Sequence, residues 1–158
     1  LLDLLEAIPH LSRIRFHSRY PIILPERIDT ELSEYLQQHR CTIIMVIHSN
    51  HPNELSIEVV KALNLLNKNE ITLLNQSVLL AGINDNADTL SQLSEQLFTH
   101  NVLPYYLHQL DKVQGAQHFA VSDTVAKDLI RTLQNQLPGY LVPRLVRENS
   151  GDPAKQPL

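Results

Sequence analysis

The stretch Thr42-Ile-Ile-Met-Val-Ile47 is apolar at almost every position and is followed at once by His48-Ser-Asn-His51. A short continuous apolar run is typical of a strand that is buried on both faces, as strands of parallel sheets are. In parallel α/β sheets the residues that bind ligands follow the carboxyl ends of the strands. The point where this run turns polar is therefore the first indication of a functional site.

Other apolar runs alternate with segments of helical period on either side of this stretch. Strands are expected over residues 14–17, 42–47, 71–80 and 103–107, and helices over residues 29–38, 53–66, 88–100 and 122–137. Asp29 is expected to cap the first of these helices. This alternation predicts an α/β fold made of consecutive βα units with right-handed crossovers. The 158 residues are enough for a sizeable core but short for a complete eight-stranded barrel.

Composition narrows the classes of function. The net charge of -4 and the pI of about 6.0 give no basic surface for nucleic acid or for an anionic membrane. The longest apolar run is too short to span a membrane. The single cysteine, Cys41, cannot form an internal disulfide or hold a metal centre alone, and it fits a reducing, cytoplasmic compartment. The first residues carry neither an initiator methionine nor a signal-peptide pattern, so we expect the chain to begin within a longer protein.

Polar side chains stand at the end of every expected strand. They are expected to gather at one edge of the sheet, because the carboxyl ends of parallel strands meet there. The residues are His17, Ser18 and Arg19 after the first strand, His48 to His51 after the second, Asn75, Gln76 and Ser77 in the third, and His108, Gln109 and Asp111 after the fourth. Together they predict a ligand pocket at this edge.

Each of these residues also has a local interpretation. The run that begins at His48 is compatible with a hydrophilic loop, and Asp111 is compatible with capping a turn near Gly115. Arg19 is compatible with a surface ion pair to Glu26. Gln76 needs partners wherever it points, since an unpaired amide inside an apolar strand costs about 1 to 3 kcal/mol.

The end of the chain, Gly151-Asp-Pro-Ala-Lys-Gln-Pro157, places one lysine among small residues and prolines. If desolvation lowers the pKa of Lys155, its amine is a nucleophile that can carry an aldehyde such as pyridoxal phosphate as a Schiff base. An isolated lysine is more often solvated. The two interpretations differ in whether Lys155 lies beside the strand-end residues.

Several blocks of the sequence resemble the lysine 2,3-aminomutases, radical S-adenosylmethionine enzymes that also use pyridoxal phosphate. The resemblance runs through almost the whole chain. It is carried by residues 13–19, 24–28, 48–54, 75–85, 104–111, 118–119 and 139–143, and it extends to Lys155. It implies an α/β fold that is the C-terminal half of a partial (β/α) barrel of the radical-SAM type, with residues 1–137 in the barrel and residues 138–158 as a C-terminal segment.

The resemblance implies an isomerase that converts L-α-lysine to (R)-β-lysine by radical 1,2-amino migration. Lys155 resembles the lysine that carries pyridoxal phosphate, and Asp111 is similar to the carboxylate that pairs with the side-chain ammonium of the substrate. The positions expected to contact S-adenosylmethionine are His48, Gln76, Asn75 and Ser77.

The chain departs from the family pattern in two places. Glu148 stands where the free-lysine aminomutases have an aspartate, and Ser150–Ala154 replaces a glycine-rich run. This tail is similar to that of the bacterial branch that makes (R)-β-lysine for modification of elongation factor P, so Glu148 is a second candidate for substrate binding. The family's C-x-x-x-C-x-x-C loop for a 4Fe–4S cluster has no counterpart here. Its ligands are expected upstream of Leu1, and this part alone is expected to be inactive.

Two other functions are compatible with the residues. In an aldolase-like barrel, Lys155 would form a Schiff base with the substrate directly and no cluster would be needed. In a non-catalytic α/β module that binds a protein through its helices, the strand-end residues would be ordinary loops. The family resemblance is also compatible with a homo-oligomer.

Overall fold

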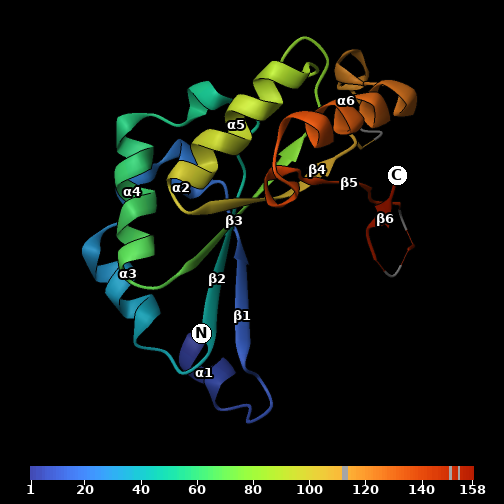
Figure 1. Cartoon of the computed structure of the whole chain (residues 1–158). Coiled ribbons are helices and arrows are strands. Elements are labelled where there is room, and N and C mark those ends of the chain that lie inside the picture. Colours follow the sequence, from blue (N-terminus) through green and yellow to red (C-terminus); the bar gives the residue numbers. More distant parts are fainter. Residues whose placement is uncertain (112–113, 150, 153) are drawn as a thin grey trace.

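The structure is a computed structural model, and it describes residues 1–111, 114–149, 151–152 and 154–158. Its centre is a six-stranded sheet in which the strands follow their order in the chain (Figure 1). The strands are β1 (Arg13–His17), β2 (Thr42–Ile47), β3 (Thr72–Val78), β4 (Val102–His108), β5 (Arg144–Arg147) and β6 (Gln156–Pro157). The first five are parallel, and β6 runs antiparallel to β5.

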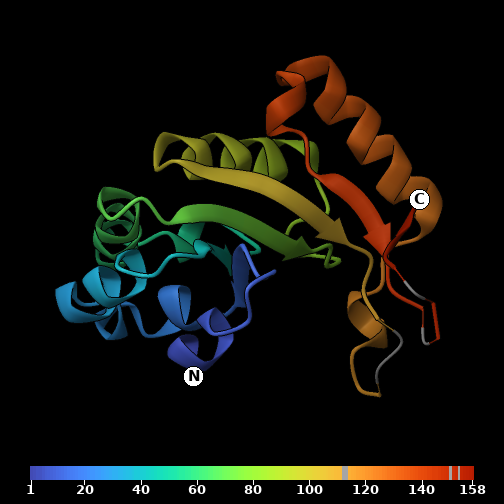
Figure 2. The same ribbon diagram turned by 90° about the horizontal axis from the view of Figure 1, so that it is seen from below.

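Each parallel strand pairs with the strand that precedes it, so every crossover advances the sheet in the same direction. This is the strand order of a barrel and not of a doubly wound sheet. The sheet curls, with helices on its convex side and an open concave side (Figure 2). The helices are α1 (Leu2–Glu6), α2 (Tyr20–Ile23), α3 (Thr30–Gln37), α4 (Ile57–Lys68), α5 (Ala87–Thr99) and α6 (Asp123–Gln136). The expected α/β half-barrel is confirmed.

Side-chain caps fix where the longer helices begin. Asp29 caps α3 as expected, accepting a hydrogen bond of 2.8 Å from the backbone N–H of Leu32. The helix expected from Asn53 begins later, at Ile57, because Ser56 caps α4. The residues before it, Pro52–Glu54, form a separate 3-10 turn.

The convex face of the sheet holds the hydrophobic core. Alternate residues of β2, Ile43, Met45 and Ile47, pack in one cluster with Leu63 and Leu66 of α4. A second cluster lies under α6 and the 3-10 turn Gly139–Leu141, and it joins the outward residues of β4 and β5 to this helix. Burial of these side chains is the main favourable contribution to the fold.

The expected strands and helices all form, with ends shifted by a few residues. Among the α-helices and strands of the described residues, four were not expected: α1, the single turn α2, and the short strands β5 and β6. The missed strands have weak patterns, since Arg144-Leu-Val-Arg147 is flanked by charge and β6 has two residues, one of them Pro157. Tertiary pairing with β4 places them in the sheet.

Among the described residues, no helix combines the length and the apolar character needed to cross a membrane.

Candidate functional site

The concave side of the sheet gathers polar side chains at the carboxyl ends of its strands. His17 ends β1, His48 follows β2, Gln76 lies in β3 and His108 ends β4. The rings of His17 and His48 meet edge to face with centroids 6.3 Å apart, and Nε2 of Gln76 lies 3.0 Å from Nε2 of His48. The expected grouping of strand-end residues is therefore present in this part of the chain.

The histidines of this group are held in the neutral form. Burial, as the largest cause, lowers the pKa of His17 and of His48, and neighbouring positive charges act in the same direction. Burial and the charge of Lys155 lower the pKa of His108 to about 4. At neutral pH these rings are therefore uncharged donors and acceptors of hydrogen bonds.

Lys155 lies at the same edge of the sheet, where the parallel strands end, and does not extend into solvent. Its Nζ is 3.4 Å from Nε2 of His108 and 5.5 Å from the ring centroid of Tyr106, and it pairs with the carboxylate of Glu148. Only 23% of its side chain is exposed. Gly151, with a φ of 91°, turns the chain between β5 and β6 and so returns Lys155 to the sheet.

Burial lowers the pKa of Lys155 from its ordinary value, and the positive charge of Arg15 adds to this effect. Tyr105 and the carboxylate of Asp111 act in the opposite sense and raise the pKa of Lys155. A lowered pKa makes the neutral form of an amine, which is its nucleophilic form, more accessible than it is in a solvated lysine.

Asp111 and Glu148, the partner of Lys155, both line two hollows. The smaller, of about 340 Å³, is shared with His48, Gln76 and His108. The larger, of about 830 Å³, is shared with Gln109, Asp123 and Arg147. A ligand placed between these hollows would meet the two carboxylates at one end and the histidine group at the other.

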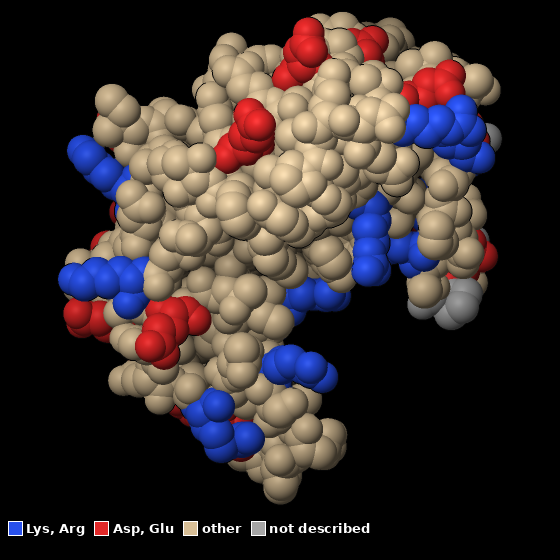
Figure 3. Space-filling model, viewed as in Figure 1, with Lys and Arg blue, Asp and Glu red and all other residues tan. Residues whose placement is uncertain are grey.

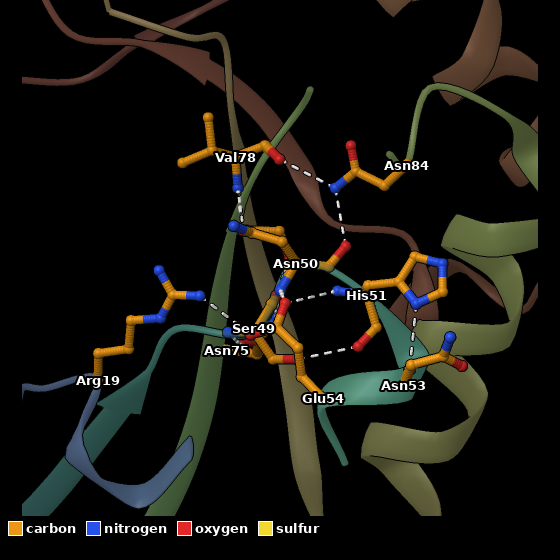
Figure 4. A network of polar contacts seen from close by, with 10 residues as sticks. Arg19, Ser49, Asn50, His51, Asn53, Glu54, Asn75, Val78 and Asn84 are labelled. Carbon is orange, nitrogen blue, oxygen red and sulfur yellow. Dashed lines mark hydrogen bonds and ion pairs between the residues drawn. The ribbon is translucent and has the colours of Figure 1, made fainter. Parts of the chain in front are cut away.

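Asn75 and Ser77 point to the other face of β3, because side chains alternate along a strand. Asn75 accepts a bond of 2.9 Å from the Ser49 N–H and donates one of 3.0 Å to the Ser49 carbonyl, and the Ser77 hydroxyl donates to that same carbonyl at 2.7 Å. The hydroxyl of Ser77 and the amide of Asn75 therefore point away from the Gln76 amide, although Ser77 lines the smaller hollow together with Gln76 and His48. Asn75 holds the loop that begins at Ser49 (Figure 4).

The same loop is held from its other end by Glu54. Its carboxylate accepts hydrogen bonds from the backbone N–H groups of Asn50 and His51, at 2.8 and 3.1 Å. It also pairs with Arg19 at 3.2 Å (Figure 4). The alternative pairing of Arg19 with Glu26 is thus wrong, because the turn of α2 directs Arg19 toward the loop after β2.

Two residues that shape the site were not singled out in the sequence, Arg15 and Tyr106. Both lie on the concave face, Arg15 by its alternation with Ile14 and Phe16 in β1, and Tyr106 beneath Lys155. The polar-apolar alternation of Arg13-Ile-Arg-Phe-His17 was the signal that could have identified Arg15. Lys and Arg side chains line the notch between the N-terminal strands and the C-terminal segment (Figure 3).

No cluster of three or more His, Cys, Asp or Glu side chains suited to a metal ion occurs within residues 1–111, 114–149, 151–152 and 154–158.

No family model matches the chain. Its sequence is similar to proteins named L-lysine 2,3-aminomutase. It is 51% identical to the Haemophilus influenzae protein over 98% of this chain, and 52% identical to the Escherichia coli protein over 100% of it. The protein of that name from Clostridium subterminale is 36% identical over 98% of the chain. The resemblance indicated by the sequence blocks is confirmed over essentially the whole chain.

The chain spans less than half of these relatives, 46% of the first two and 37% of the third. Among solved structures, a radical SAM methyltransferase from Sphaerobacter thermophilus matches 77% of this chain and 39% of that one, with a TM-score of 0.58 and 13% sequence identity. At that identity the match shows the fold alone, and it supports the half-barrel.

Proposed function

We propose that this chain is the part of a lysine 2,3-aminomutase that carries the cofactor lysine and the carboxylates for the substrate ammonium. The observation that carries the proposal is the position of Lys155. The chain returns after β5 to place this amine against His108, Tyr106 and Glu148, at the lip where the strands end. A lysine in a solvated tail would instead extend away from the sheet.

The residues around Lys155 fit pyridoxal phosphate. The Lys155 side chain is about three-quarters buried, the pKa of its amine is lowered, and its neighbour His108 is a neutral acceptor that can take a hydrogen bond from it. A hollow of about 790 Å³ beside Lys155 is lined by Tyr106 and Arg144, whose hydroxyl and guanidinium suit a polar, anionic cofactor. When bound, pyridoxal phosphate supplies the conjugated π-system through which an amino group can migrate.

The residues around Gln76 fit S-adenosylmethionine. The Oε1 atom of Gln76 is buried and accepts no hydrogen bond from the residues that the structure describes. A buried acceptor without a partner costs about 1 to 3 kcal/mol, so a ligand N–H or O–H group would relieve that cost. His48, next to it, offers a second hydrogen-bonding atom. When bound, S-adenosylmethionine supplies the radical that removes hydrogen from the substrate.

The described residues do not fit an iron–sulfur cluster. Cys41 is 2% exposed, its thiol donates to the Leu11 carbonyl at 3.3 Å, and it precedes β2 at the end of the sheet away from the site. A cluster needs several thiolates together. Its ligands would have to come from the length of the relatives that this chain does not span.

Glu148 and Asp111 are proposed to bind the side-chain ammonium of the substrate lysine. The pairing of Lys155 with Glu148 supports this proposal, because the ε-ammonium of Lys155 is chemically the same as that of the substrate. The ammonium of a substrate that enters the hollows would replace Lys155 as the partner of Glu148. Lys155 would then lose the contact that favours its charged form. Binding of the substrate ammonium and release of the Lys155 amine would then be coupled.

The assignment to one branch of the family rests on the sequence of the C-terminal tail. We propose that the product is (R)-β-lysine, made in the cytoplasm and passed to the modification of elongation factor P. Glu148 in place of an aspartate supports this branch, because a longer acid reaches further into the hollow that it shares with Asp111.

The test is conversion of isotopically labelled L-lysine by the full-length protein, reconstituted with an iron–sulfur cluster, pyridoxal phosphate and S-adenosylmethionine. We expect (R)-β-lysine, with formation that stops when either organic cofactor is withheld. A product that forms without S-adenosylmethionine would instead support the aldolase-like reaction. A protein that reacts with no aldehyde at Lys155 would support the non-catalytic module.

A further inference from the structure

One carboxylate oxygen joins three elements at the wall of the larger hollow. Oδ1 of Asp123, the first residue of α6, accepts a hydrogen bond of 3.0 Å from Nε2 of Gln109 and pairs with the guanidinium of Arg147. Gln109 is 4% exposed, and its Nε2 also donates to the Val121 carbonyl at 2.8 Å. Asp123 thus links the loop after β4, the start of α6 and the end of β5.

The two partners of Asp123 stand next to the proposed substrate carboxylates. Gln109 comes two residues before Asp111, and Arg147 directly precedes Glu148. Arg147 is also the residue that pairs with Gln156 in the β5–β6 ladder, and Gln156 directly follows Lys155. A movement of Arg147 would therefore carry Glu148 and Lys155 with it.

The segment that bears Glu148 and Lys155 has few other attachments to the sheet. The β5–β6 ladder has two registered pairs, Val146 with Pro157 and Arg147 with Gln156, and Leu158 adds one hydrogen bond of 3.2 Å to the Leu145 carbonyl. A two-residue antiparallel strand is too short to fix the position of a hairpin by itself. Side-chain contacts at its base must supply the remainder.

We propose that Asp123 is a positioning residue, which fixes the separation between Asp111 and the Glu148–Lys155 pair by holding Gln109 and Arg147 on one oxygen. This inference rests on the proposed function for the roles of Asp111, Glu148 and Lys155. Asp123 lines the larger hollow, but its Oδ1 is taken by Gln109 and Arg147, and in this account the substrate ammonium binds to Asp111 and Glu148. Asp123 sets the distance between the two carboxylates that bind one ammonium group. This distance in turn determines which amine the site binds.

The chain offers a matched control on the same helix. Asp128 pairs with Arg131 at 2.7 Å, with side chains 59% and 72% exposed, and neither side chain forms a hydrogen bond or ion pair with Gln109 or with the described residues of the β5–β6 hairpin. Asp123→Ala and Asp128→Ala each remove one Asp–Arg pair from α6. Asp123→Asn keeps an acceptor for Gln109 and removes the charge that faces Arg147.

The experiment compares these three variants with the parent full-length protein, reconstituted with its cofactors. In Asp123→Ala we expect the KM for lysine to rise about tenfold or more, since a misplacement of about 1 Å can cost a hundredfold. We expect a smaller rise in Asp123→Asn and no change in Asp128→Ala. A KM within twofold of the parent in Asp123→Ala would overturn the proposal, as would a loss confined to kcat together with a lowered Tm.

Hydrogen exchange separates this inference from the proposed function, because it needs no turnover. The amides of Gln109 and Leu158 are bonded to Val146 and Leu145, and both should exchange faster in Asp123→Ala than in Asp128→Ala. If the parent protein makes no β-lysine but this difference in exchange is seen, the proposed function fails and the link through Asp123 stands. Equal exchange in the two variants would overturn the link whatever the reaction.

Discussion

The convex and concave faces of this sheet are built from the same strands, but the convex face packs against helices and the concave face carries polar side chains. On the convex face, alternate residues such as Met45 and Leu73 are almost fully buried under helices. On the concave face the polar residues His17, His48 and Gln76 lie at or near the ends of the strands. The described helices leave this face of the sheet open (Figure 2). The hydrophobic core is concentrated on the first face and the candidate ligand-binding groups on the second.

The difference shows how a short chain can hold a polar site without losing its core. Helices cover one side of the strands β2 to β5, and this burial stabilises the fold. The concave side is then free to carry groups that are costly to leave unpaired, such as the amide oxygen of Gln76. Substitutions on the concave face should alter ligand binding, and those on the convex face should alter stability.

The largest effect is expected at the end of the site that binds the substrate ammonium. Asp111→Ala in the full-length protein should raise the KM for lysine by about two orders of magnitude or more, because a charged ligand group would be left without its partner. Asp152→Ala is the control, since this acid lies on the same hairpin as Lys155 and bonds only Asn149 among the described side chains. Steady-state kinetics checks both, and an unchanged rate and affinity in Asp111→Ala would refute its role.

The next largest effect is expected in the core under α4. Leu63→Ala should lower the free energy of unfolding by about 2 to 5 kcal/mol, because Leu63 is 0% exposed and leaves a cavity. The concave-face control is Thr72→Ala in β3, an exposed position where a change of about 0.5 kcal/mol or less is expected. Urea unfolding measures both. Similar losses at the two positions would remove the distinction between the faces.

A sharper contrast lies within β3, where neighbouring amides face opposite sides. Asn75→Ala should lower the free energy of unfolding by about 1 to 3 kcal/mol, because it leaves the backbone N–H of Ser49 unpaired and removes one of the two hydrogen bonds to the Ser49 carbonyl. Gln76→Ala should cost less than that, since it removes a buried oxygen that has no described partner. It should nevertheless weaken the binding of S-adenosylmethionine about tenfold, as measured by calorimetry. A Gln76 variant that binds as well as the parent would exclude this residue from the ligand site.

The smallest effect is expected from pH. His108 resists protonation in the folded state, with a pKa of about 4 against 6.5 ordinarily, and it faces Lys155, Asp111, His48 and His17. The unfolded chain therefore binds the proton first, and stability should fall as the pH is lowered from about 6.5 to about 4. His108→Gln should lose less stability over this window in urea unfolding. An equal loss in both proteins would place the pH dependence at other groups.

The sequence predicted the parts of the fold that depend on strong local patterns. The apolar run Thr42–Ile47, the cap at Asp29 and the long helices α4 to α6 all formed near their expected bounds. The strands β5 and β6 were missed because their position depends on pairing with β4 and with each other, which local composition does not encode. The start of α4 was misplaced because Pro52 opened a separate turn.

The candidate site was predictable as a location and less so as a set of contacts. The rule that ligands lie beyond strand ends identified His48 and Gln76, and the turn of small residues identified Lys155. The rule did not say which face of the sheet Asn75 and Ser77 occupy, although the alternation of side chains along β3 puts them on the opposite face from Gln76. The link through Asp123 was not visible in the sequence, because Gln109, Asp123 and Arg147 are far apart in the chain and meet only after folding.

The central claim is that the amine of Lys155 is the attachment point for pyridoxal phosphate. The most direct measurement is borohydride reduction of the full-length protein with this cofactor, followed by peptide mapping with mass spectrometry. We expect the pyridoxyl label on Lys155, with much less label when excess free lysine competes before reduction. Label on other lysines such as Lys127, or no stable label at all, would contradict the account.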